Sequence, residues 1–190
     1  MVRRLGMILL VICCLALTVS VMAQDDMSAP VASGLNSPRH ISFGPDGTLY
    51  IAEAGTGGDA EVASMVGGTV QVGGTAQVTA VSADGEQSVF LPEMTSTFAD
   101  FATEGVSSVL VDEEYAWVVM AGLGPAPADV PEGLPPTASV LQISLDTLEI
   151  ENVVDLYAFE QENNPDGTDD LAANPQDIAV GPDGTLYIVD

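Results

Sequence analysis

Apolar and polar residues alternate along several short segments of this chain, with the period of two that is typical of β-strands. One such segment lies in the octapeptide GPDGTLYI, which occurs at Gly44–Ile51 and again at Gly181–Ile188. Chance identity over eight positions is improbable, so the repetition predicts internal repeats in the fold. A second alternating segment, RHISF or QDIAV, precedes each octapeptide. Each copy therefore predicts a strand, a turn and a second strand.

The triplet PDG predicts the turn between these two strands. Its proline presets φ at the second turn position, and its aspartate hydrogen-bonds the local backbone. Its glycine, Gly47 in one copy and Gly184 in the other, can adopt the positive φ that the turn requires. This chemistry is typical of a hairpin with a G1-type bulge.

A weaker third copy, EGVSSVLVDEEYAWVVMAGLG, lies between the two octapeptides. It keeps both alternating strands but replaces the PDG turn by Asp112-Glu113-Glu114. The steps from Pro38 to Gly105 and from Gly105 to Pro175 are 67 and 70 residues. The repeat period is therefore about 68 residues, and the two octapeptides lie two repeats apart.

Each full repeat contains a second predicted hairpin. Its strands are Thr75–Ser82 and Glu86–Met94 in the first repeat, and Thr137–Leu145 and Glu149–Tyr157 in the second. Four antiparallel strands at this spacing predict a β-propeller built from four-stranded antiparallel blades. Outside the N-terminus, only Ala158–Asn163 shows a helical period, so we expect an all-β fold.

The repeats divide the chain into about two and a half blades. Blade 1 is expected at residues 37–103, blade 2 at 104–173 and the start of blade 3 at 174–190. Residues 24–36 form an N-terminal segment whose apolar stretch, Val31–Leu35, is expected to be a ring-closing strand. Because propellers close with roughly four to eight blades, we expect these residues to be the N-terminal part of a longer protein.

The N-terminus has the pattern of an export signal. Two arginines precede an apolar run that ends with Val21-Met22-Ala23, which predicts a cleavable signal peptide at residues 1–23. Cys13 and Cys14 lie inside it, so the mature chain has no cysteine for a disulfide or a thiolate site. We expect a secreted protein, extracellular or periplasmic. The alternative is a retained membrane anchor, because the run is near the shortest length that spans a bilayer.

The charge of the mature chain limits its partners. Removal of the signal leaves Arg39 as the only Arg or Lys against 28 Asp and Glu. Such a surface repels nucleic acid and anionic lipid, so no nucleic-acid partner is expected, and a membrane partner only if the signal is retained. The chain is nevertheless 47% hydrophobic, which is too apolar for a disordered protein.

Propeller geometry places the long connections on one face of the predicted disc. These connections are Gly55–Gly74, Gly122–Pro136 and Gln161–Asn174. The first strand of each blade begins on the same face, so residues after the repeat prolines should surround the mouth of the central channel. We therefore take this face as the candidate binding site, with Arg39, His40, Gln176 and Asp177 at its centre.

The stretch ENNPDGTDDLAAN suggests a calcium site. Its oxygen-bearing residues follow the spacing of an EF-hand loop, and the candidate ligands are Glu162, Asn164, Asp166 and Asp170. Against calcium, a glutamate stands where aspartate is expected, Ala173 occupies the position of the bidentate carboxylate, and no flanking helices are evident. The alternative is a polar loop built from Asn-Pro and Asp-Gly turns.

Several longer motifs resemble one known family. GLNSPR, AEAGTGG and the block LYAFEQENNPDGTDD followed by NP make the chain similar to the ScyD/ScyE family, associated with scytonemin biosynthesis. The resemblance covers nearly the whole mature segment and implies a secreted NHL-like β-propeller, without catalytic residues to carry over. The chain departs from the family in having His40 where a glycine is common, and in lacking cysteines in its glycine-rich insertion.

Three functions are compatible with this sequence. The first is a secreted, non-catalytic binding or scaffold propeller that presents its loop-rich face to a protein, a glycan or a small ligand. The second is a hydrolase of the calcium-dependent lactonase type, for which Asp177 is the one plausible channel ligand. The third is a structural role at the cell surface, favoured if the signal remains as an anchor. A serine hydrolase is poorly supported, because the chain has no GxSxG elbow.

Overall fold

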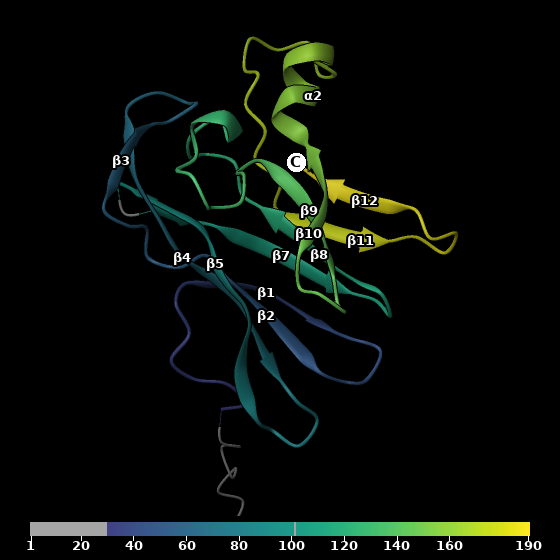
Figure 1. Ribbon diagram of the computed structural model, residues 1–190. Coiled ribbons are helices and arrows are strands. Elements are labelled where there is room, and N and C mark those ends of the chain that lie inside the picture. Colours follow the sequence, from purple (N-terminus) through teal and green to yellow (C-terminus); the bar gives the residue numbers. More distant parts are fainter. Residues whose placement is uncertain (1–29, 101) are drawn as a thin grey trace, which may run out of the picture. The chain divides into compact units, whose positions relative to one another are not determined.

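The computed structural model describes residues 30–100 and 102–190, which form mostly antiparallel β-structure (Figure 1). The predicted signal peptide and residues 24–29 lie outside the described residues. In the described part of the chain, no helix is long and apolar enough to cross a membrane. The strands belong to three sheets that follow one another along the sequence.

The first sheet is an antiparallel meander with two short additions. Its strand order is β1-β2-β4-β5-β6, and β3 pairs with the far end of β4. The bounds are β1 Pro38–Phe43, β2 Leu49–Glu53, β3 Ala60–Ala63, β4 Thr69–Val81, β5 Gln87–Ala99 and β6 Ala102–Glu104. The β1–β2 turn has the predicted chemistry, because Gly47 has a φ of 84° and Asp46 accepts from the Thr48 N–H at 3.0 Å.

The middle sheet is a four-stranded meander, and the third sheet is a single hairpin. The middle sheet has the order β10-β9-β8-β7. Its bounds are β7 Val106–Val111, β8 Tyr115–Met120, β9 Ser139–Ser144 and β10 Ile150–Asp155, and those of the third sheet are β11 Asp177–Val180 and β12 Leu186–Val189. A 3₁₀ turn, η1 at Pro127–Asp129, lies between β8 and β9.

One α-helix follows β10, at the segment where the sequence shows a helical period. This helix, α2, spans Leu156–Asn163. It begins there because the Asp155 side chain accepts a hydrogen bond from the Ala158 N–H, as a helix N-cap does. It ends at Asn164, which adopts the left-handed conformation with a φ of 41°.

The middle sheet packs between the other two. One hydrophobic core joins the first and middle sheets and includes Ala52 and Val78 on one side and Val109 and Leu141 on the other. A second, smaller core joins the middle sheet to the third through Val119, Val140 and Ile178. Strand β7 contacts both β1 and β11, so the first strands of the three sheets lie beside one another (Figure 1).

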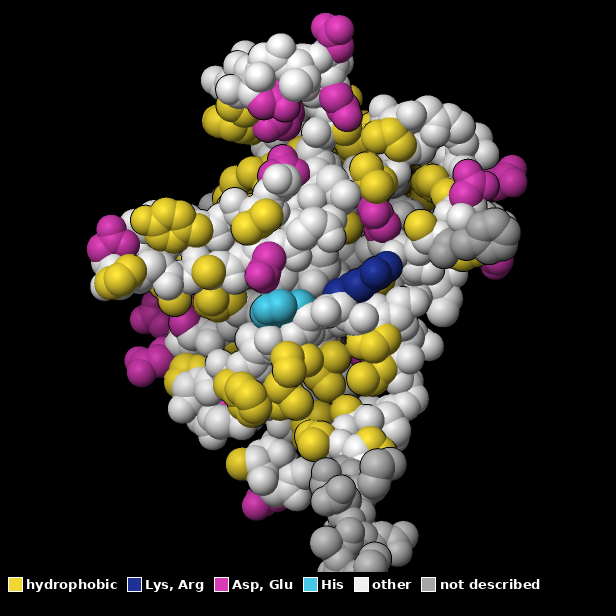
Figure 2. Space-filling view, turned by 180° about the vertical axis from the view of Figure 1, so that it is seen from behind, with side chains coloured by type: hydrophobic (Ala, Val, Ile, Leu, Met, Phe, Trp, Pro, Cys, Tyr) yellow, Lys and Arg dark blue, Asp and Glu magenta, His cyan; other side chains and the backbone are white. Residues whose placement is uncertain are grey.

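No described sheet covers the outer face of the first sheet or the outer face of the third sheet. Ile41 and Phe43 on β1 are 59% and 70% exposed, and Tyr187 and Val189 on β12 are 58% and 61% exposed. Hydrophobic side chains also gather below the histidine in the rear view of the surface (Figure 2). The three sheets do not close into a ring within the described residues.

The glycine-rich insert differs from the prediction. Residues 55–74 were expected to form a loop, but β3 and the first half of β4 pair as strands within them. The reason is the close approach of two backbones: a Cβ on Gly58 would lie 2.4 Å from the Gly73 Cα. Only glycine permits this contact, so the glycines of the expected loop instead allow the β4–β5 hairpin to extend.

The stretch Val31–Leu35 contains no strand in the structure. Ser33 instead exchanges two hydrogen bonds with the Gln87 side chain, at 3.1 and 3.0 Å, and Asn36 donates its N–H to the buried Glu53 carboxylate. The segment is therefore fastened to the first sheet by side chains. Its predicted role in ring closure stays a prediction.

Candidate functional site

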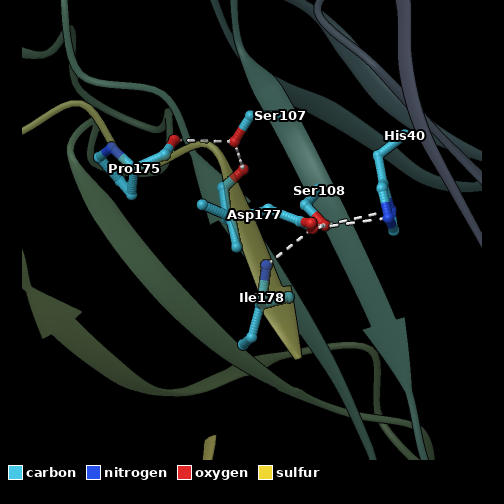
Figure 3. Close-up of polar contacts among 7 residues, drawn as sticks. His40, Ser107, Ser108, Pro175, Asp177 and Ile178 are labelled. Carbon is cyan, nitrogen blue, oxygen red and sulfur yellow. Dashed lines mark hydrogen bonds and ion pairs between the residues drawn. The ribbon is translucent and has the colours of Figure 1, made fainter. Parts of the chain in front are cut away.

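Three polar side chains, one from the first strand of each sheet, meet where β1, β7 and β11 lie side by side (Figure 3). The Ser108 hydroxyl donates to Asp177 Oδ1 at 2.7 Å and lies 3.1 Å from His40 Nδ1. His40 Nε2 lies 3.5 Å from the same carboxylate oxygen. The structure thus brings two predicted site residues, His40 and Asp177, within 3.5 Å of each other and adds a serine that contacts both.

The hydrogen bonds of this cluster define the role of each atom. Ser108 has a single hydroxyl proton, and the short contact directs it to Asp177. His40 Nδ1 must then carry a proton and donate it to the Ser108 oxygen, since two acceptors cannot share this contact.

This cluster does not have the geometry of a hydrolytic triad. In a triad the serine donates to the histidine, and the histidine donates to the carboxylate. Here the serine donates directly to the carboxylate, and Ser108 is fully buried. A buried hydroxyl whose proton already points away from the imidazole is not placed to attack a substrate.

Sequence reasoning missed Ser108 because it counted the second repeat from Gly105. That count aligns His40 with Ser107, but β1 and β7 have the same one-residue register shift before Ile41 and Val109, so Pro38 corresponds to Val106 and His40 to Ser108. Ser107 therefore points elsewhere and donates to the Pro175 carbonyl at 3.0 Å. The mean period of about 68 residues, applied to His40, does lead to Ser108, so a signal for this residue was present.

The other two predicted residues, Arg39 and Gln176, line one small cavity of about 60 Å³ beside this cluster. Arg39 donates from its guanidinium to the Thr103 carbonyl. Gln176 donates to the Asn174 side-chain oxygen at 2.8 Å. All four predicted binding residues therefore lie near the N-terminal ends of β1 and β11, in two neighbouring pairs.

Glu104 also lines this small cavity and was not predicted. Burial raises the pKa of its carboxyl above the ordinary value, although a hydrogen bond from the Leu123 N–H and the nearby Arg39 charge act in the opposite direction. The cavity thus places a guanidinium, a primary amide and a carboxyl group next to one another.

The three predicted long connections are joined by hydrogen bonds. Ser64, in the glycine-rich insert, donates from its hydroxyl to the Leu123 carbonyl at 2.9 Å, and Met65 donates its N–H to the Gly124 carbonyl. Gly122 in turn donates its N–H to the Asn174 side chain at 2.9 Å. These contacts show that the connections gather in one region, as the sequence predicts.

A larger cavity lies where the first two connections meet. Its volume is about 440 Å³, and its wall includes Val66, Val70, Asp100, Glu104 and Leu123. Glu104 also lines the small cavity beside Arg39. The loop region therefore offers a recess large enough for a small ligand, next to the predicted site residues.

The predicted calcium ligands do not converge on one point. Glu162 lies in α2, and Asn164 ends that helix. Both carboxylate oxygens of Asp166 accept from Thr168, at 2.9 and 3.2 Å, and Asp170 accepts from the Ala172 N–H at 3.1 Å. The buried Oδ1 of Asn164 has no hydrogen-bond partner among the described residues.

These contacts fit a polar loop better than a preformed cation site. Among the described residues, no group of three or more His, Cys, Asp or Glu side chains is placed to hold a metal ion. The carboxylates instead accept hydrogen bonds from the backbone of their own loop, as aspartates in turns do. Calcium at this loop stays a prediction.

Comparison of the chain with protein-family models, with curated proteins and with solved structures finds no match.

Proposed function

We propose that this protein is a secreted β-propeller of the ScyD/ScyE type, and that it serves as a non-catalytic binding or scaffold protein. The proposal rests on one observation: hydrogen bonds hold the three long connections together, and these connections lie next to Arg39, His40, Gln176 and Asp177. Long connections held on a rigid β-scaffold are the usual place for ligand binding.

The arrangement of the sheets supports the propeller. Each sheet begins a new repeat, its strands follow one another as a meander, and β7 packs between β1 and β11. In a propeller the first strand of each blade lies nearest the central channel, and successive blades pack face to face. The His40–Ser108–Asp177 cluster would then surround the mouth of that channel.

The chemistry of the site favours a neutral polar ligand. Arg39 and His40 supply donors, and Asp177, Glu104 and Gln176 supply acceptors within the same region. A polyanion would be repelled by the acidic surface, whereas a hydroxyl-rich ligand such as a glycan can use donors and acceptors together. A protein or another small ligand with the same polar groups would bind by the same contacts.

The second candidate is a hydrolase of the calcium-dependent lactonase type. It is favoured by the Asp177 side chain, which is 49% exposed at the proposed channel mouth and carries a carboxylate that a cation could use. Against it, Asp177 Oδ1 already accepts from Ser108 and from the Ile178 N–H. A metal would have to compete with these bonds.

The proposal is tested by ligand capture with the mature chain. The mature protein would be screened on a glycan array, and binding to the strongest glycan would be measured by calorimetry. Arg39→Gln together with Gln176→Ala should weaken binding about tenfold or more, because hydrogen bonds from a charged group are lost. Glu86→Gln, in the distant β4–β5 turn, is the control and should bind like the wild type.

Two results would count against the proposal. Equal binding by the double variant and the wild type would remove this region as the site. Calcium-dependent release of product from a lactone, abolished by Asp177→Asn, would favour the hydrolase instead.

A further inference from the structure

The chain contains four Asp-Gly steps, and each lies in the same kind of turn. They are Asp46-Gly47, Asp84-Gly85, Asp166-Gly167 and Asp183-Gly184. In every step the glycine has a positive φ, between 69° and 85°, and its N–H donates to the carbonyl three residues earlier at 2.8 to 3.1 Å. The backbone is therefore similar at all four steps, and what distinguishes them is their side chains.

Three of these aspartates are tethered by a threonine two residues later. The threonine donates its backbone N–H to the carboxylate at 2.9 to 3.1 Å, and the pairs are Thr48 with Asp46, Thr168 with Asp166, and Thr185 with Asp183. In the first two pairs the threonine hydroxyl also donates to the other carboxylate oxygen, at 2.9 and 3.2 Å. A carboxylate held in this way moves only when these bonds break.

Asp84, in the turn between β4 and β5, has no such tether. The residue two positions later is Glu86, and its N–H donates to the Ser82 hydroxyl at 3.1 Å instead of to the aspartate. Among the described residues, no hydrogen bond reaches the Asp84 carboxylate, and residues 83–87 are all exposed. The Asp84 carboxyl group is therefore free to turn toward the backbone nitrogen of Gly85.

We propose that Asp84-Gly85 is a site of spontaneous isomerisation, where the peptide linkage moves from the α-carboxyl to the β-carboxyl group of Asp84. The other three Asp-Gly steps resist this reaction because their carboxylates are tethered. Glycine favours the reaction at all four steps, since it has no side chain to hinder attack by its nitrogen. The reaction needs no ligand, so it is independent of the proposed function.

The reaction passes through a cyclic imide and consumes nothing but water. The Gly85 nitrogen attacks Cγ of the neutral Asp84 carboxyl group, an N–Cγ bond forms, and the carboxyl hydroxyl leaves with the amide proton as water. Water then opens the succinimide ring. Its attack at Cγ restores the original linkage, whereas its attack at the former peptide carbon breaks the bond from that carbon to nitrogen and leaves a β-linked residue. The composition of the chain is unchanged.

A threonine tether opposes this reaction in two ways. The carboxyl carbon must leave its hydrogen bonds before it can approach the glycine nitrogen, which raises the barrier. In addition, only the neutral carboxyl group loses its hydroxyl readily, and hydrogen bonds from the threonine backbone and hydroxyl lower the pKa of Asp46 and Asp183, which keeps both ionised. At Asp84 no bond of this kind has to break.

The first experiment measures the reaction at each Asp-Gly step of the folded mature protein. The protein would be kept for several weeks in water enriched in heavy oxygen, because opening of the succinimide leaves a labelled oxygen in the chain. After pepsin digestion, mass spectrometry should show label entering the Asp84 peptide about fivefold or more faster than the three tethered peptides, the factor that one net hydrogen bond contributes. Isoaspartyl methyltransferase should methylate the same peptide.

Asp84→Glu is the matched control. It keeps the charge of the turn but requires a larger ring that forms more slowly, so this peptide should take up far less label. Equal labelling of all four Asp-Gly peptides in the folded wild type would overturn the proposal.

A second experiment gives Asp84 the missing tether. Ser82→Gly together with Glu86→Thr reproduces the glycine and the threonine of the two octapeptide turns, and it should slow labelling at Asp84 to the level of Asp46. Thr48→Ala removes a hydroxyl bond at Asp46 and should speed labelling there. If neither variant changed the labelling rate of its aspartate, the tether would not be the cause.

Labelling in urea separates the fold from the local sequence. Unfolding removes all the tethers, so the four Asp-Gly steps should label at similar rates. An excess at Asp84 that persists in urea would come from its neighbouring residues rather than from the turn, and would overturn the proposal.

Discussion

The first and middle sheets are formed by two successive copies of the repeat but have different surroundings. The middle sheet is covered on both faces, and its row Val109, Val118 and Leu141 is fully buried. In the corresponding row of the first sheet, Ile41 is 59% exposed, but Ile51 and Thr79 are 3% and 1% exposed although no described sheet packs there. The alternating pattern therefore marks a face as suited to burial, whereas tertiary contacts decide which of its residues are buried.

The largest expected effect comes from the middle sheet. Leu141→Ala should reduce the free energy of unfolding by about 2–5 kcal/mol, because it leaves a cavity in a closed core. Ile41→Ala, at the start of the corresponding row, should cost less than about 1 kcal/mol, because its side chain is largely exposed. Urea unfolding of both variants measures the contrast. Equal losses of unfolding free energy in Leu141→Ala and Ile41→Ala would mean that another group covers Ile41.

A second effect concerns the junction between the middle and third sheets. A Cβ on Gly122 would lie 1.7 Å from the Ala173 carbonyl oxygen, so Gly122→Ala should destabilise the protein by about 1–3 kcal/mol. Gly74→Ala is the matched control, since the nearest atom to its Cβ would be the end of the Leu134 side chain, at 3.0 Å, and the Glu93 backbone would lie in ordinary contact at 3.7 Å. Thermal unfolding compares the two variants. If Gly74→Ala lost as much thermal stability as Gly122→Ala, the close approach of Gly122 to the Ala173 carbonyl oxygen would be contradicted.

A third effect distinguishes the turns of the two sheets. Asp112, in the middle sheet, accepts from the N–H groups of Glu114 and Tyr115 and from Trp117 Nε1, at 2.8, 2.7 and 3.0 Å. Burial raises the pKa of Asp112, but these hydrogen bonds outweigh it and hold the pKa below the ordinary value. In the first sheet, hydrogen bonds from Thr48, and to a smaller extent from the Asp46 backbone, lower the pKa of Asp46.

The lowered pKa sets the direction of the pH dependence. Asp112 contributes stability above the pKa of an unfolded aspartate, and this contribution is lost as the pH falls through the lower pKa of the folded state. Asp112→Asn should therefore cost about 1 kcal/mol at pH 7, after allowance for solvent screening, and less at pH 3. Urea unfolding at both pH values tests this. A loss of unfolding free energy that is larger at pH 3 than at pH 7 would contradict this prediction.

The smallest expected effect is that of calcium. Because Asp166 and Asp170 already accept hydrogen bonds within their own loop, calcium at constant ionic strength should leave the Tm of the mature protein unchanged, and EDTA should do the same. Magnesium is the control for a general cation effect. A rise in Tm that tracks calcium and disappears in Asp166→Ala would restore the metal site and make lactone hydrolysis the next activity to assay.

Much of the local structure could be predicted from the residues. The PDG turns, the order of the strands and the helical segment before Asn164 follow from φ preferences, alternation and short-range hydrogen bonds. These are properties of a few neighbouring residues, so they are visible in one sequence. The pairing of His40 with Asp177 was also accessible, because a repeat places equivalent residues at equivalent positions.

Other features depended on contacts between distant segments. The register that brings Ser108 rather than Ser107 to His40 depends on how β7 pairs with β8. The strands within residues 55–74 depend on Gly58 meeting Gly73, which no local pattern reports.

The residues alone specify the repeat, its turns and the faces that are fit to pack, because these depend on covalent geometry and on the order of side chains. Contacts between distant parts of the chain decide which of those faces are covered. Ile41, Val109 and Ile178 hold the same position in three copies, yet they are 59%, 0% and 5% exposed. Burial requires a second surface, and that surface belongs to another part of the fold.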